Sequence, residues 1–241
     1  MTSTQIPAVA ALADILARIE AARKAALKPA ASTRLIAVSK TFEAGAIRPV
    51  LAAGHRVFGE NRVQEALRKW PALRNEFEGV ELHLIGALQT NKAAEAVVFF
   101  DIIQTLDRPK LAHALRREMD RSGRAPDIFI QVNTGAEPQK GGVAPEALAP
   151  LLALSRDSLS LPVKGLMCIP PAGEAPAPHF ALLAKLAETH GLARLSMGMS
   201  ADFEIAIRFG ATHVRVGTAI FGRRDQNAGL ESDGAEASDL L

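Results

Sequence analysis

Short apolar runs recur along the chain and alternate with stretches whose apolar residues follow a helical spacing. The first such stretch, residues 7–27, has Leu12 and Ile15 among apolar residues at intervals typical of an amphipathic helix. The β-branched and apolar runs that come after it predict eight strands. These strands are expected at residues 34–40, 56–61, 81–86, 99–105, 127–133, 163–169, 194–199 and 213–218.

Helix-like segments separate the predicted strands. They cover residues 62–76, 108–121, 144–156, 178–190 and 202–209. Asp107, Thr90 and Ser200 are predicted N-caps, because a short polar side chain can accept hydrogen bonds from the free N–H groups of a first helical turn. Gly191 and Gly210 stand where helices commonly end in glycine.

The repeated strand–helix alternation, in a chain of 241 residues, predicts a single (β/α)8 TIM barrel. The main alternative is a doubly wound open sheet, but no G-x-G-x-x-G follows an early strand and no Walker A sequence occurs. We expect the barrel, with its N-terminal helix, over residues 1–224. Residues 225–241 contain five acidic residues and no basic ones, which predicts a disordered tail.

Composition narrows the classes of protein to which the chain can belong. Its formal net charge is +2 and it has no long basic segment, which argues against a nucleic-acid binder. Its single cysteine, Cys168, suits a reducing compartment and lies in no cluster of metal ligands. Charges at Asp14 and Arg18 interrupt the first apolar stretch, so neither a signal peptide nor a membrane span is predicted. We expect a cytoplasmic monomer with no nucleic-acid, membrane or metal partner.

Functional groups of a (β/α)8 barrel lie at the carboxyl ends of its strands, and the first and last strands both end in candidates. Lys40 could form a Schiff base with an aldehyde, and desolvation where the apolar run "IAVSK" emerges from the barrel core would make its amine a better nucleophile. Gly217 lets the backbone approach an anion, and a helix beginning at Thr218 would add N–H donors. A ligand that carries both an aldehyde and a phosphate would satisfy both ends, and pyridoxal 5′-phosphate (PLP) is the leading candidate.

Other strand ends add polar groups to the same rim. Asn61 ends the second predicted strand, and Ser200 follows the seventh, where its hydroxyl could reach a phosphate. Three of these candidates also have a purely structural explanation. Lys40 could be a solvated charge, Ser200 only an N-cap and Gly217 only a turn residue.

Arg215 is an arginine within an otherwise apolar strand. Side-chain alternation places His213, Arg215 and Gly217 on one face of the strand. A buried arginine needs a partner, since leaving it unpaired is costly. The partner could be Glu60, in an ion pair within the barrel, or the pyridine nitrogen of PLP. An arginine at that nitrogen would keep it unprotonated and weaken the ring as an electron sink.

Seven segments, in order and spanning roughly residues 10–224, resemble the YggS/PROSC family of PLP homeostasis proteins. The segments are "AVSK", "FGENRVQEA", "HLIGALQTNK", "QVNTGAEPQKGG", "GLMCIP", "LSMGMSADFEIAI" and "VRVGTAIFG". The resemblance implies a single barrel similar to the N-terminal domain of bacterial alanine racemase. It also implies that the protein buffers PLP or delivers it to apo PLP-dependent enzymes, with no catalytic turnover.

The resemblance further implies a role for each candidate residue. Lys40 would carry PLP as a Schiff base, Asn61 would line the cofactor pocket and Arg215 would face the pyridine nitrogen. Ser200, Gly217 and Thr218 would hold the phosphate.

Two enzymatic alternatives stay open at this point: an amino-acid racemase on the same barrel, and a Schiff-base lyase acting on a sugar phosphate. Racemases with a similar barrel use a tyrosine from a second domain as one of two bases, and this chain contains no tyrosine. His83 or Lys92 could supply a different second base, although His83 is expected to be a hydrogen-bonded core residue. We therefore favour the carrier.

Overall fold

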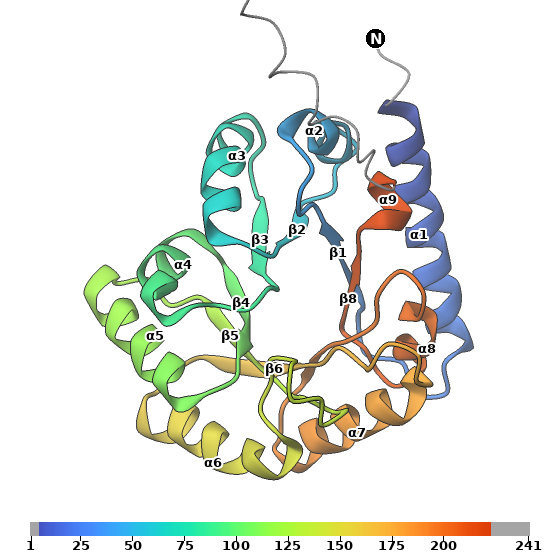
Figure 1. Ribbon diagram of the computed structural model, residues 1–241. Helices are drawn as coiled ribbons and strands as arrows, with labels where there is room; N and C mark the ends of the chain where they lie inside the picture. The colour runs from blue at the N-terminus through green and yellow to red at the C-terminus, as the bar shows by residue number, and fades with distance from the viewer. Residues whose placement is uncertain (1–4, 223–241) are drawn as a thin grey trace, which may run out of the picture.

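The computed structural model describes residues 5–222, which form a closed barrel of parallel strands in the order β1 to β8 (Figure 1). The strands are β1 Arg34–Val38, β2 Val57–Glu60, β3 Glu81–Leu84, β4 Ile102–Leu106, β5 Asp127–Gln131, β6 Val163–Met167, β7 Arg194–Ser196 and β8 His213–Val216. The predicted (β/α)8 barrel is confirmed. The predicted acidic tail at 225–241 lies outside the described residues.

Most strands end one to three residues before the predicted end, which matters for the site. β1, for example, ends at Val38 and β8 at Val216. The last residues of these apolar runs have left the strands and form loops at one rim of the barrel. Lys40, Asn61 and Gly217 therefore lie just past their strands.

Helices cover the outside of the barrel (Figure 1). They are α1 Gln5–Ala25, α2 Ala44–Ala52, α3 Val63–Glu76, α4 Ala93–Phe99, α5 Pro109–Ser122, α6 Leu148–Leu152, α7 Pro176–Thr189, α8 Phe203–Arg208 and α9 Thr218–Phe221. Short 3-10 turns, Thr90–Lys92 and Pro145–Ala147, precede α4 and α6, and a π-helical turn, Ala153–Ser158, follows α6. Gly191 and Gly210 follow α7 and α8 with φ of +66° and +85°, as predicted.

Helix α1 covers the barrel where the helix after β8 is too short to do so. α9 has only four residues, and α1 lies against both α8 and α9 (Figure 1). Leu12, Ile15 and Ile19 of α1 are buried in this contact. Arg18 on the same helix pairs with Glu204 of α8 at 3.0 Å. The N-terminal helix thus completes the outer layer.

The three predicted N-caps are wrong. Arg108, not Asp107, is the N-cap of α5, and the Asp107 carboxylate accepts instead from the Arg108 guanidinium at 2.5 Å. Thr90 lies within the 3-10 turn before α4. Asp202, not Ser200, is the N-cap of α8, and its carboxylate accepts from the backbone N–H of Met199 at 2.6 Å.

The inside of the barrel is only partly apolar. Ile102, Phe129 and Met167 form a small interior cluster, whereas the large core lies between the strands and the helices. Val214 and Val216 belong to the large core, and Arg215 is directed to the interior, as the alternation predicted. Buried polar groups in such an interior must be hydrogen-bonded if the barrel is to be stable.

Two kinds of feature are absent from residues 5–222. No helix there has the length and apolar character required to cross a membrane. No three histidine, cysteine or carboxylate side chains within that range are grouped so that they could hold a metal ion.

Candidate functional site

A cavity of about 350 Å³ at the carboxyl ends of the strands brings together all six candidate residues. It is lined by Val38, Lys40, Asn61, Ile85, Ile169, Met199, Ser200, Ala201, Arg215, Gly217 and Thr218. The candidates come from loops after β1, β2, β7 and β8 and from β8 itself. Parallel strands carry their carboxyl ends to one rim, and this is why residues so distant in sequence share one cavity.

Lys40 lies two residues beyond β1, and its position is fixed by a tight turn. Thr41 has a left-handed backbone, with φ of +67°. The ammonium group of Lys69 donates to the carbonyl oxygens of Ser39 at 2.7 Å and Phe42 at 3.1 Å, on either side of Lys40. Lys40 itself is exposed, so the prediction of a desolvated amine is wrong.

Lys69 belongs to a buried polar cluster between β2 and α3. Its Nζ lies 2.9 Å from the Oε1 of Glu60, and their side chains are 2% and 0% exposed. The same Glu60 oxygen accepts from the Ser39 hydroxyl at 2.5 Å and from the Trp70 indole at 2.9 Å. Burial raises the pKa of Glu60, although Lys69 and the hydrogen bonds oppose that shift. Glu60 is therefore committed outside the barrel, and the Glu60–Arg215 ion pair that we considered is wrong.

Arg215 is buried in the barrel without a carboxylate. Its Nη1 donates to the Ser196 hydroxyl at 2.8 Å, and its Nη2 donates to the Cys168 carbonyl at 2.8 Å. The ion pairs within residues 5–222 include none with Arg215, which is 4% exposed. Burial lowers the pKa of this guanidinium. Five N–H donors are available on a guanidinium, so two contacts leave donors for a ligand in the cavity that Arg215 lines.

Ser200, Gly217 and Thr218 form one corner of the cavity. A Cβ on Gly217 would lie 3.0 Å from the carbonyl oxygen of Val38, so a side chain there would crowd β1. Helix α9 begins at Thr218, as predicted. The Thr218 hydroxyl donates toward that of Ser200 at 3.4 Å. This corner offers hydroxyls and backbone N–H groups, the donors that suit an anion.

Sequence reasoning missed the apolar part of the cavity wall. Ile85 directly follows β3, and Ile169 is the second residue after β6, at the same rim as Asn61. Met199 completes this wall and is exposed. The signal was available, because each residue stands at a strand end like the polar candidates. A wall of this kind suits the faces of a planar ring.

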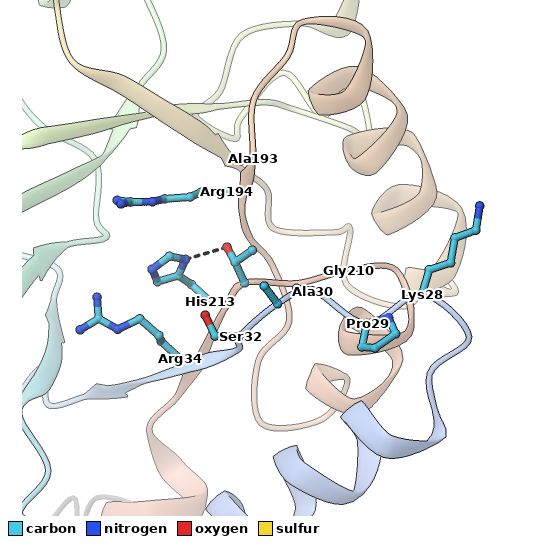
Figure 2. A pocket seen from close by; sticks show the side chains of 11 residues that line it. Lys28, Pro29, Ala30, Ser32, Arg34, Ala193, Arg194, Gly210 and His213 are labelled. Carbon is cyan, nitrogen blue, oxygen red and sulfur yellow. Dashed lines mark hydrogen bonds between the residues drawn. The ribbon is translucent and has the colours of Figure 1, made fainter.

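A second hollow, of about 410 Å³, lies at the opposite mouth of the barrel (Figure 2). Figure 2 shows His213 between the side chains of Arg34 and Arg194. Both arginines are already paired, with Glu81 at 2.9 Å and Asp127 at 2.7 Å. Burial, together with the nearby His83, Arg34 and Arg194, lowers the pKa of His213 to about 3. None of the six candidate residues lines this hollow. The cavity at the carboxyl ends of the strands, called the upper cavity below, is therefore the candidate site.

Comparison with known proteins gives consistent results. Residues 11–225 match the family model for the alanine racemase N-terminal domain. The chain is 40% identical to a pyridoxal phosphate homeostasis protein of Aquifex aeolicus, over 88% of this chain and 96% of the relative. It is 42% identical to one of Pseudomonas aeruginosa, over 90% and 96%.

Two solved structures locate the fold. PipY of Synechococcus elongatus, with PLP bound, has 40% identity and a TM-score of 0.74, over 85% of this chain and 98% of that chain. An alanine racemase of Clostridium difficile has a TM-score of 0.66 at 14% identity, over 88% of this chain and 56% of that chain, and shares the fold alone.

Proposed function

Because this chain belongs to the family of pyridoxal phosphate homeostasis proteins, within the alanine racemase N-terminal domain family, we propose that its upper cavity is the PLP site. The protein binds PLP and serves the homeostasis of that cofactor. Buffering PLP in the cytoplasm and delivering it to apo-enzymes are the finer parts of this proposal. A chain with one cysteine suits such a reducing compartment.

One observation carries the assignment of the cavity. Arg215, a buried arginine that forms no ion pair with a carboxylate in residues 5–222, lines the same cavity as Lys40. Arg215 has only neutral acceptors, so its charge is available to a ligand. Lys40 lines the same cavity and can bond covalently to an aldehyde. When bound, PLP supplies that aldehyde and an electron-withdrawing ring.

The remaining residues fit the other parts of the cofactor. Thr218 and Ser200 would donate hydrogen bonds from their hydroxyls to the phosphate, and Gly217, where a side chain would crowd Val38, would let the backbone approach it. Arg215 would face the ring nitrogen and Asn61 an edge of the ring. An arginine at the nitrogen keeps it unprotonated and makes the ring a poor stabiliser of a carbanion, which suits a carrier better than a racemase.

Thr218→Ala tests the phosphate corner. Loss of a hydrogen bond to a charged group costs about 1.5–3 kcal/mol, so PLP binding should weaken about tenfold or more. Pyridoxal, which lacks the phosphate, should bind the variant and the parent protein alike. Spectrophotometric titration measures both ligands. Equal weakening of the two would mean a packing defect and would contradict the assignment of Thr218.

Racemisation of amino acids is expected to be negligible. The chain has no tyrosine, and neither alternative second base is well placed. His83 is buried with one ring nitrogen 2.8 Å from Gln104 and the other 2.7 Å from Glu81, which confirms it as a core histidine. Lys92 pairs with Glu95 at 3.2 Å and does not line the cavity. Turnover of alanine at about 1 s⁻¹ or faster, measured by a chiral assay, would overturn the carrier and favour the racemase.

A further inference from the structure

A chain of hydrogen bonds crosses the barrel interior from the proposed cofactor cavity to the opposite mouth. Arg215 Nη1 donates to Ser196 Oγ at 2.8 Å, and Ser196 Oγ donates to Gln104 Oε1 at 2.6 Å. Gln104 Nε2 lies 2.8 Å from Nδ1 of His83, whose Nε2 lies 2.7 Å from Glu81. Glu81 then pairs with Arg34, which lines the second hollow, at the opposite mouth of the barrel (Figure 2). This chain of hydrogen bonds thus links Arg215 of β8 to side chains of β7, β4, β3 and β1.

The chemistry of these groups gives each hydrogen bond one direction. A guanidinium can only donate, so Ser196 must accept from Arg215 and give its single proton to Gln104. The Gln104 carbonyl oxygen therefore faces Ser196, and its amide N–H faces His83. Nδ1 of His83 must then be unprotonated, and its Nε2–H donates to the Glu81 carboxylate.

The state of the two titrating groups agrees with this order. Burial lowers the pKa of His83, against the effect of Glu81, and a neutral ring is what the chain requires. Burial acts to raise the pKa of Glu81, but the hydrogen bond from His83 and the charge and hydrogen bond of Arg34 prevail and lower it to about 2. Ser196, Gln104 and His83 are each 0% exposed, so these contacts are shielded from bulk solvent.

We propose that Gln104, oriented by His83, is a positioning residue that aims Arg215 at the ring nitrogen of the bound cofactor through Ser196. This inference rests on the proposed function. Neutral acceptors fix the direction of the guanidinium without neutralising it, whereas a carboxylate partner would draw its charge away from the ligand. Gln104 does not line the cavity, and its connection to the ligand runs through Ser196 and Arg215.

The test compares PLP with its carbocyclic analogue, in which a C–H replaces the ring nitrogen. The parent protein should bind PLP about tenfold or more tightly than the analogue, since only PLP accepts a hydrogen bond from Arg215. Gln104→Met, close in shape to glutamine, should reduce that ratio to near one. Thr105→Val is the matched control. It removes the neighbouring buried hydrogen bond, from Thr105 to the Gly86 carbonyl at 3.0 Å, outside the chain, and should preserve the ratio.

Ser196→Ala provides a second route to the same result if Gln104→Met folds poorly. It should also reduce the preference for PLP over the analogue to near one. The double variant should show no further reduction of that preference, because both residues act along one path. A preserved ratio in both variants, or losses that add, would overturn the positioning role while leaving PLP binding intact. A parent protein that binds no PLP would instead overturn the proposed function, and one that binds both ligands equally would overturn the pairing of Arg215 with the ring nitrogen.

Discussion

Lys40→Ala is expected to abolish covalent attachment of PLP. Borohydride treatment of the parent protein with PLP, followed by peptide mass mapping, should place a pyridoxyl group on Lys40 and on no other residue in comparable yield. The variant should give no such peptide, because the other lining residues of the cavity contain no amine side chain. It should retain weaker binding of PLP, since the phosphate corner and Arg215 are unchanged.

Lys92→Ala is the matched control for this experiment. Lys92 is also next to a strand-end loop, but it pairs with Glu95 and stands outside the cavity wall. Its replacement should leave labelling of Lys40 at the parental yield. The assignment would be contradicted if the pyridoxyl group were found mainly on Lys92 in the parent protein. It would also be contradicted if Lys40→Ala were still labelled within the cavity.

Lys69→Met is expected to cause the largest loss of stability. The substitution leaves Glu60 buried without its cation and releases the carbonyl groups of Ser39 and Phe42. Removing one partner of a buried ion pair costs about 3–5 kcal/mol. Urea denaturation at neutral pH should show this loss, whereas Lys110→Met, at an exposed position of α5, should change the free energy of unfolding little.

The loss of stability caused by Lys69→Met should become smaller as the pH falls. Burial raises the pKa of Glu60 in the folded protein, so the folded state binds that proton more tightly than the unfolded state. This group therefore favours the fold at low pH and disfavours it as pH rises past the unfolded pKa, near 4.5. Without Lys69, burial raises the pKa of Glu60 further, because the charge that opposed the shift is gone. Protonation of Glu60 then removes more of the free-energy cost of burying its carboxylate. A loss that is equal at pH 7 and pH 5 would contradict the account, and Glu60→Gln in the Lys69→Met background should restore part of the stability.

The barrel and the strand ends of the site could be predicted because both depend on patterns of local sequence. Lys40, Asn61 and Thr218 each follow an apolar run, and in a parallel barrel such runs end at one rim. The side on which Arg215 lies also followed from alternation along β8. These properties need no knowledge of distant residues.

The partners of the polar groups could not be predicted in the same way. Ser196 and Gln104 are 92 residues apart and meet only because β7 and β4 face each other across the barrel. Glu60 was considered as a partner of Arg215, but the pleat turns it outward to α3, where Lys69 and Trp70 lie. Pairing of this kind depends on which side of the sheet each residue occupies and on the geometry of closure.

The position of Trp70 has a spectroscopic consequence. It is the only tryptophan in a chain without tyrosine, so ultraviolet emission comes almost entirely from one buried indole. That indole shares the carboxylate of Glu60 with Ser39, the residue before Lys40. Its fluorescence should therefore respond to a chromophore bound at Lys40, by energy transfer over a short distance. The unlabelled protein would carry an intrinsic probe of cofactor loading and release, suited to stopped-flow measurement of transfer to an acceptor enzyme.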